Sequence, residues 1–319
     1  MKLYYNLSDL KHEKKSIWLA AGFFDGVHRG HQAVIRQVIE KARSREASWI
    51  MTFDMHPLKL LTPHAAPPLL TSTPHKIRLM DSEGIQGCVV LRFTRATARL
   101  SPEKFIAKLV KSVRNLRGMV IGSNWTFGKN GSGTPQLLKK LGNYHGFEVS
   151  VVRPLNWQRE PISSTRIRRA VAGGRLEEAS AMLGRKFSIA GTVVSGHGIG
   201  GKRLGIPTAN VNLHNEVVPP NSVYAIHAII DRHCYDGVAN IGIQPTFSSL
   251  PDQHHKKESK RHKILEVHLF DMSSNILGKE IEVFFKKRLR AERRFVTLAA
   301  LKARILQDIN SAKKNLASK

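Results

Sequence analysis

Two histidines separated by one helical turn, His28 and His31, are the first residues whose spacing suggests chemistry. They stand in the sequence GFFDGVHRGH at residues 22–31, which follows an apolar run and precedes apolar residues with helical spacing. A strand, a tight turn and a helix start would present free backbone N–H groups and the positive end of the helix dipole, which bind phosphate. Histidines there would donate hydrogen bonds and carry charge near neutral pH. Three interpretations stay open for this segment: a nucleotide-phosphate site, a metal pair, or two surface histidines.

A second group of polar side chains lies in the sequence ISSTRIRR at residues 162–169. Ser163 or Ser164 is a natural N-cap for the helix that is predicted to follow, and this is the simpler interpretation. The hydroxyl groups together with Arg166 and Arg168 would also hold a polyphosphate, because guanidinium groups match phosphate in geometry and charge.

The sequence HGIGGKRLGIPTAN at residues 197–210 suggests a third polar site. Residues 196–203 nearly match the phosphate-binding pattern GxxxxGK[ST], but Arg203 replaces the magnesium-binding hydroxyl and no helix pattern follows, so we reject that motif. Thr208 and Asn210 are two residues apart, so their side chains would point the same way from an extended segment. Their oxygen atoms suit Mg²⁺ carried by a nucleotide, whereas the alternative is a β-turn with polar caps.

Glu266 supplies a carboxylate in the alternating sequence LEVHLF. On a strand, Glu266 and His268 would share one face, while Leu265 and Val267 would share the other. A glutamate at the mouth of a barrel would accept a proton from an alcohol, whereas a solvent-facing glutamate would have no special role. The alternation alone leaves both possibilities open.

The first half of the chain must position the first two sites, and it alternates short apolar runs with helical patterns. This alternation predicts an α/β architecture, a doubly wound parallel sheet with helices on both faces. Ligands of such sheets bind at the carboxyl ends of the strands, where residues 22–31 and 162–168 fall. The predicted strands are residues 17–23, 49–53, 87–93, 118–121 and 147–152. The predicted helices are residues 31–43, 74–83, 101–115 and 134–146.

Runs rich in β-forming residues follow one another after Lys186, where we place the boundary between domains at residues 1–185 and 186–319. Strands without intervening helices predict a small antiparallel barrel. The predicted strands are residues 187–194, 223–230, 235–243, 263–270 and 280–285. A final helix at residues 297–312 is expected to close the barrel with an apolar stripe of Leu298, Leu301, Ile305 and Ile309. The basic segment at residues 252–262 is predicted to be a mobile, solvated loop.

The chain of 319 residues is long enough for two cores and carries a formal net charge of +27. The sequence contains no recognised nucleic-acid module and no aromatic residues interleaved with its basic runs, so we expect no nucleic-acid partner. No apolar run reaches the roughly 18–20 residues that cross a bilayer. The charged N-terminal residues lack an apolar signal core, so a cytoplasmic location is expected. Cys88 and Cys234 lie in or beside apolar runs and are predicted to be buried free thiols.

The motifs, in this order, resemble the prokaryotic bifunctional riboflavin kinase/FAD synthetase family over almost the whole chain. The matching segments are GFFDGVHRGH (22–31), TFDMHP (52–57), ISSTRIR (162–168), LGIPTAN (204–210), GVANIGIQPTF (237–247), LEVHLFD (265–271) and LRAERRF (289–295). The resemblance implies a Rossmann-like nucleotidyltransferase domain followed by a riboflavin kinase barrel. It implies an enzyme that phosphorylates riboflavin to FMN and adenylylates FMN to FAD, using Mg²⁺ and ATP. Its partners would be the small molecules riboflavin, FMN and ATP, without a membrane or nucleic acid, and it implies nothing about oligomeric state.

For adenylyl transfer, the resemblance implies that the FMN phosphate attacks the α-phosphorus of ATP and that pyrophosphate leaves, so no protein nucleophile is required. His28 and His31 would contact the ATP phosphates, and Asn124 would assist there and at the flavin. The other expected ATP contacts of this domain are Gly22, Phe23, Asp25, Gly30, Ser163, Ser164 and Arg168.

For phosphorylation, the resemblance implies that Glu266 accepts the proton of the ribityl hydroxyl, while Thr208 and Asn210 hold Mg²⁺ together with ATP. The further ATP contacts would be Gly201, Lys202 and Pro207. Arg290 and Phe295 fall in a segment that would cover the flavin.

Two rival hypotheses accompany this interpretation. Gln244 stands where the family usually has arginine, and the loop after Asn124 also departs from the family's pattern, so the first rival is a transferase with one active domain. The second rival is a nucleic-acid-binding protein on the same fold, which the charge of +27 would favour.

Overall fold

The computed structural model describes residues 1–43, 45–195, 205–214, 216–244, 262–272, 274–293 and 295–317. The chain forms two compact units, Met1–Ile167 with Met182–Gly184, and Arg168–Ala181 with Arg185–Lys319. None of the helices in the described ranges is long and apolar enough to cross a membrane.

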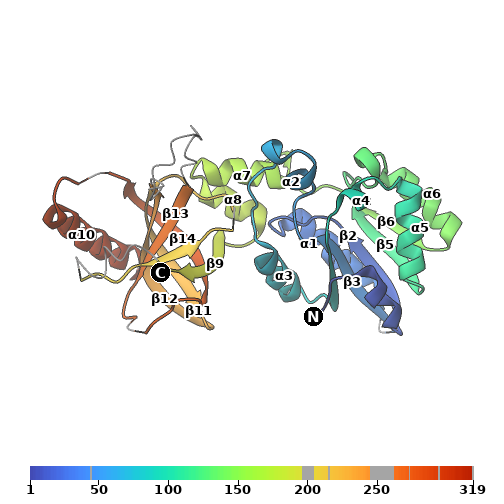
Figure 1. Ribbon diagram of the computed structural model, residues 1–319, viewed down its shortest axis with the longest axis horizontal. Helices are drawn as coiled ribbons and strands as arrows, with labels where there is room; N and C mark the ends of the chain where they lie inside the picture. The colour runs from blue at the N-terminus through green and yellow to red at the C-terminus, as the bar shows by residue number, and fades with distance from the viewer. Residues whose placement is uncertain are drawn as a thin grey trace, which may run out of the picture. The chain divides into compact units, whose positions relative to one another are not determined.

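The first unit is built on a parallel sheet of six strands in the order β1-β4-β3-β2-β5-β6, so the predicted α/β architecture is confirmed (Figure 1). The strand order reverses direction between β2 and β5, and ligands of doubly wound sheets bind at such a switch point. Strand β1 has only three residues and was not predicted. The strands are β1 (Lys2–Tyr4), β2 (Ser16–Ala21), β3 (Glu46–Phe53), β4 (Gly87–Leu91), β5 (Leu116–Gly122) and β6 (Glu148–Val152).

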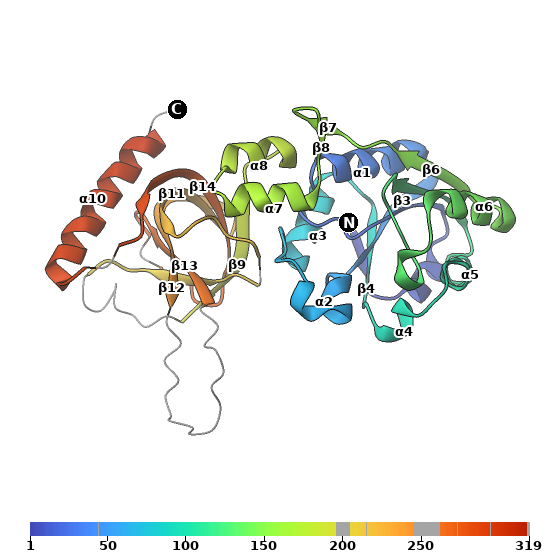
Figure 2. The same cartoon turned by 90° about the horizontal axis from the view of Figure 1, so that it is seen from above.

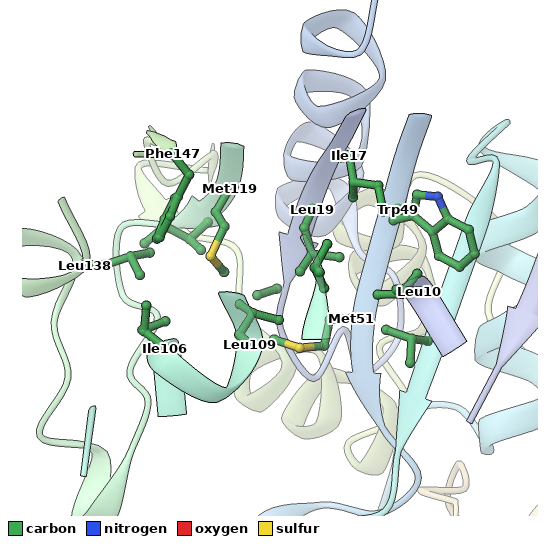
Figure 3. Close-up of a cluster of buried hydrophobic side chains, with 14 of the residues drawn as sticks. Leu10, Ile17, Leu19, Trp49, Met51, Ile106, Leu109, Met119, Leu138 and Phe147 are labelled. Atoms are coloured by element: carbon green, nitrogen blue, oxygen red, sulfur yellow. The ribbon is translucent and has the colours of Figure 1, made fainter. Parts of the chain in front are cut away.

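Helices cover both faces of this sheet because its strands carry apolar side chains on both sides. In β2, Leu19 packs into the core beneath α5 and α6, whereas Trp18 packs into the core beneath α1 and α3. Figure 3 shows the first of these cores, with Leu109 of α5 and Leu138 of α6 facing the strands. The helices are α1 (Arg29–Lys41), α2 (Pro57–Leu61), α3 (Thr73–Ser82), α4 (Arg95–Ala98), α5 (Pro102–Ser112) and α6 (Pro135–His145). Short elements complete the unit: η1 (Leu7–His12), η2 (Pro63–Ala65), η3 (Lys129–Gly131) and the hairpin of β7 (Asn156–Trp157) and β8 (Glu160–Pro161).

Leu109→Ala is expected to lower the free energy of unfolding of the first unit by about 2–5 kcal/mol, because it leaves a cavity at a fully buried position. Urea titration followed by tryptophan fluorescence measures this, since all 4 tryptophans (Trp18, Trp49, Trp125 and Trp157) lie in the first unit. Leu61→Ala is the matched control, because Leu61 is 52% exposed and should change stability by at most about 0.5 kcal/mol. Equal midpoints for the two variants would contradict the assigned core.

Two helices follow the hairpin, α7 (Ser164–Ala172) and α8 (Leu176–Leu183). The Oγ atom of Ser163 accepts a hydrogen bond from the backbone N–H of Arg166 at 3.3 Å, so Ser163 is the N-cap of α7. Gly174 has a φ of 76° after the last turn of α7, a conformation that favours glycine.

The second unit contains a closed antiparallel barrel in the strand order β10-β13-β12-β11-β14-β9, as predicted. Helix α10 (Leu298–Ala317) lies along the outside of the barrel and contacts β11, β12 and β14 (Figure 2). Its inner face is formed by Ile309, Ala312 and Leu316, whereas Leu298, at the start of the expected stripe, is 48% exposed. The strands are β9 (Ser188–Val194), β10 (Ala209–Asn212), β11 (Ser222–Ile230), β12 (His233–Gln244), β13 (His262–Leu269) and β14 (Glu280–Ala291).

Both cysteines are free thiols, but only one of them is buried. Cys88 lies in the core of the first unit, and burial raises the pKa of its thiol to about 12. The expected burial of Cys234 is wrong, because Cys234 pairs with the exposed Ile229 next to the turn of the β11–β12 hairpin. The expectation for the basic segment falls almost entirely on residues outside the described ranges.

Candidate active sites

The turn between β2 and α1 has an unusual backbone. Phe24, Gly26 and Val27 all have positive φ values, of 55°, 81° and 40°, and strain of this kind collects at functional sites. The turn ends at His28, the N-cap of α1, whose Nδ1 accepts a hydrogen bond from the backbone N–H of His31 at 3.3 Å. The two imidazole rings are stacked, with centroids 3.6 Å apart.

His31 is neutral in this arrangement. Burial, reinforced by the neighbouring His28 and Lys76, lowers the pKa of His31 well below its ordinary value. Its Nδ1 atom is buried and has no hydrogen-bond partner among the described residues. The general expectation of charge near neutral pH therefore does not apply to His31, which offers a hydrogen bond from an uncharged ring. Within the described ranges, no three His, Cys, Asp or Glu side chains gather as a metal site would require.

Asp25 fixes the turn to a distant segment of the same unit. Its buried carboxylate accepts hydrogen bonds from the backbone N–H groups of Leu70 at 2.9 Å and Thr71 at 3.1 Å. The backbone N–H of Gly26 donates to Thr71 Oγ1 at 3.1 Å, and Ser164 Oγ donates to the Asp25 carbonyl at 3.0 Å. Asp25 therefore bonds the protein backbone, and Ser164 lies beside the turn as expected for one site.

The two arginines of the ISSTRIR segment have different surroundings. Arg166 Nη1 donates to the carbonyl oxygens of Trp157 at 2.9 Å and Glu160 at 3.0 Å, and its guanidinium lies over the Trp157 ring. It therefore braces the β7–β8 hairpin. Arg168 is half-buried, one helical turn after Ser164, and belongs to the second compact unit.

The remaining predicted contacts of the first site lie close to the switch point. Gly22 and Gly30 have no side chain and so leave room for nearby rings. A Cβ atom would lie 3.0 Å from the Phe24 ring at Gly22 and 3.1 Å from the His28 ring at Gly30. The Phe23 ring packs edge-on against a histidine of the TFDMHP segment, with centroids 5.0 Å apart. Asn124 is exposed after the carboxyl end of β5, the neighbour of β2.

One buried residue of this region, Lys76 of α3, was not predicted to belong to the site. Its Nζ atom lies within hydrogen-bond distance of the carbonyl oxygen of Phe23, which places it under the turn. The sequence did contain a signal for Lys76. It lies four residues before the buried Met80, on the helix face where an apolar residue is usual.

The barrel places three polar residues side by side on neighbouring strands. Glu266 of β13 pairs with Asn210 of β10 on one side and with Asn240 of β12 on the other. Thr208 Oγ1 donates a hydrogen bond to Glu266 Oε1 at 2.6 Å. Leu265 is fully buried whereas Glu266 is half-buried, so the carboxylate lies on the outer, more open face of the barrel. Asn240 lies in the GVANIGIQPTF segment but was not predicted to be a site residue. Its place beside Glu266 depends on strand register.

A cavity of about 310 Å³ adjoins the other side of the Pro207–Ala209 segment. Its walls are mostly apolar and include Val193, Pro207, Thr208, Ala209, Val267, Leu269, Ile276 and Leu277. His268 Nδ1 donates to the carbonyl oxygen of Pro207 at 2.7 Å and so holds this segment against β13. Thr208 therefore lies between an apolar cavity and a carboxylate, while Gly201 and Lys202 lie outside the described residues.

Arg290 is held by the C-terminal helix. Its Nε and Nη2 atoms donate to the buried Asp308 carboxylate at 3.0 and 2.7 Å, and Arg304 lies 3.3 Å from the same carboxylate. The guanidinium carbon of Arg290 is 5.7 Å from the centre of the Phe295 ring, which is half-buried. Asp308 thus ties α10 to the segment that was expected to cover the flavin, a role that helical periodicity did not predict.

Asp308→Ala is expected to destabilise the barrel by about 3 kcal/mol, because it leaves the Arg290 guanidinium without its carboxylate at a mostly buried position. Calorimetric unfolding of the full chain measures this effect. Asp231→Ala is the control, because its ion pair with Lys279 is exposed and is worth at most about 1 kcal/mol. Equal transition temperatures for the two variants would contradict the assigned role.

Comparisons with known proteins match both halves of the chain. One family model, described as FAD synthetase, matches residues 10–166, and another, described as riboflavin kinase, matches residues 183–316. Similar proteins include the bifunctional riboflavin kinase/FMN adenylyltransferases of Escherichia coli K12, 35% identical over 95% of this chain and 93% of the relative, and of Bacillus subtilis 168, 36% identical with the same coverage. A solved structure described as a macrolide-efflux protein from Streptococcus pneumoniae is 29% identical, with a TM-score of 0.77 over 96% of each chain.

Proposed function

Because this chain belongs to the bifunctional riboflavin kinase/FMN adenylyltransferase family, we propose that its two reactions are divided between two domains, at residues 1–185 and 186–319. The protein phosphorylates riboflavin to FMN and adenylylates FMN to FAD, with ATP as the second substrate. The observation that carries the division is the 2.6 Å hydrogen bond between Thr208 and Glu266. It joins the hydroxyl and the carboxylate of the kinase site, and both belong to the barrel.

In the first domain, the FMN phosphate attacks the α-phosphorus of ATP, and pyrophosphate leaves. The start of α1 and the neutral His31 supply hydrogen bonds to the phosphates, and His28 holds the turn in place through its cap. Ser163, Ser164 and Arg168 fix the triphosphate from α7. No proton has to leave a nucleophile, so catalysis depends on positioning the reactants and neutralising their charge.

In the barrel, Glu266 accepts the proton of the ribityl hydroxyl as that oxygen attacks the γ-phosphorus of ATP, and ADP leaves. Thr208 orients the carboxylate through its hydrogen bond, and Asn210 and Asn240 flank it on the neighbouring strands. The apolar cavity beside Thr208 has the size and lining that suit a nucleotide base. Arg290 and Phe295 lie in the segment that covers the flavin.

We propose that the kinase site binds Mg²⁺ together with ATP. The hydroxyl of Thr208 and the carboxamide of Asn210 offer hard oxygen donors next to the Glu266 carboxylate, a donor set that fits a magnesium ion brought by ATP. A bound Mg²⁺ would neutralise charge on the transferred phosphate. We also propose a cytoplasmic location, which two free thiols support.

The test uses the purified chain with Mg-ATP and either riboflavin or FMN, with the FMN and FAD products separated. Riboflavin should yield FMN and then FAD, and FMN should yield FAD directly. A folded protein that makes neither product would refute the proposal. FAD from FMN without FMN from riboflavin, or the reverse, would favour the rival with one active domain.

A further inference from the structure

Lys76 of α3 is a buried cation at the edge of the first site. Its side chain is only 1% exposed. Its Nζ atom donates to the carbonyl oxygens of Phe23 and Phe53, both at 3.0 Å, and to Thr52 Oγ1 at 3.1 Å. Phe23 follows β2 and Phe53 ends β3, so one ammonium group joins the carboxyl ends of two neighbouring strands.

The surroundings of Lys76 destabilise its charged form. All three acceptors are uncharged, and burial lowers the pKa of Lys76 to about 8, a shift that Asp25, Cys88 and Asp54 only partly oppose. An unfolded lysine keeps its proton up to its ordinary pKa near about 10.5. The unfolded chain therefore binds more protons between these values, so stability rises with pH across that window, and below it the charged lysine is a constant cost to the fold. A side chain that costs stability at the edge of a site calls for a functional explanation.

We propose that Lys76 is a positioning residue for adenylyl transfer, which fixes the β2–α1 turn through Phe23 and adds a positive charge beneath the phosphate-binding groups. The inference rests on the proposed function of this turn. Lys76 already acts on His31 through space, since its charge helps to lower the pKa of that histidine. The same field would attract the ATP phosphates, and it is strong because the site is buried.

Lys76→Met in the full chain tests this inference, because methionine has similar length but neither charge nor donors. We expect kcat for FMN adenylylation to fall about 10–100-fold, as for other residues that orient catalytic groups, and riboflavin phosphorylation to stay within about twofold. The pKa of His31, followed by NMR, should rise. Tryptophan fluorescence reports whether the first unit is folded. Arg78→Met removes a charge from an exposed position of the same helix and should change neither reaction.

Several outcomes would overturn the inference. The inference fails if a folded Lys76→Met variant adenylylates FMN within about twofold of the wild-type rate. Thr52→Val removes one acceptor of Lys76 and the hydrogen bond from Thr52 Oγ1 to the Phe23 carbonyl oxygen, but it keeps the charge. A loss equal to that of Lys76→Met would therefore exclude the electrostatic role. Wild-type protein that makes no FAD from FMN would instead refute the proposed function.

The wild-type pH profile decides the question if Lys76→Met does not fold. Adenylylation should decline as pH rises through about 8, where Lys76 loses its proton. The ionisable groups around Lys76 are Asp25 in the turn, Asp54 after β3, Cys88 on β4 and His31 on α1. Cys88 titrates only at about 12 and His31 well below its ordinary range. A flat profile through about pH 8 would overturn the inference.

Discussion

Glu266→Gln is expected to lower the rate of riboflavin phosphorylation by about 10²–10⁴-fold while FMN adenylylation stays within about twofold of the wild-type rate. Glutamine keeps the size of the side chain and can still accept a hydrogen bond from Thr208, but its amide is too weak a base to take the proton of an alcohol. The carboxylate lies on the barrel between Asn210 and Asn240 and belongs to the second unit. Product formation from riboflavin and from FMN, assayed separately, measures both effects.

Glu280→Gln provides the matched control for this experiment, because Glu280 is an exposed carboxylate at the start of β14 in the same barrel. It should leave both reactions unchanged. Loss of both reactions in a folded Glu266→Gln protein would show that the two activities are not divided as proposed. Full kinase activity in that variant would remove Glu266 from the catalytic role.

His31→Ala is expected to show the opposite pattern, with FMN adenylylation lowered by about 10²–10³-fold and riboflavin phosphorylation retained. The substitution removes a preorganised hydrogen-bonding group at the start of α1, and it also removes the ring that stacks on His28. Arg168→Ala should act in the same direction, since a guanidinium that holds the triphosphate is lost. The assay from FMN measures this loss, and the assay from riboflavin shows that the barrel is intact.

His12→Ala is the control for His31→Ala, because His12 is an exposed histidine of the same unit at the end of η1. Neither reaction should respond to it. If His31→Ala left adenylylation at the control level, the turn would not be a phosphate site. If it abolished kinase activity as well in folded protein, the two domains would not work separately.

The two architectures could be predicted from the sequence because their signals are local. Alternating apolar runs and helical spacings indicated a parallel sheet, and consecutive β-rich runs indicated a barrel; the structure confirms both. The alternation likewise placed Glu266 on the face opposite Leu265 and Val267, although it did not show which of the two faces is buried. Such patterns depend on neighbours in the chain, so they do not require knowledge of the fold.

Some features near the sites depend on residues that are far apart in the sequence. Asp25 stays a predicted ATP contact, and its carboxylate accepts hydrogen bonds from the backbone of Leu70 and Thr71, which only the folded chain brings near. Cys234 was expected to be buried, but it lies next to the turn of the β11–β12 hairpin and is exposed. Asp308 reaches Arg290 only because α10 lies against the barrel.

The sequence by itself determined the class of each domain, the order of the motifs and the identity of His28, His31, Thr208 and Glu266 as candidates, because residue type and spacing carry that information. The tertiary structure decided which face of β13 is open, that His31 is uncharged, and that Lys76 lies buried under the turn. The physical reason is that burial, strand register and the field of nearby charges arise from contacts across the fold, and periodicity along the chain does not encode them.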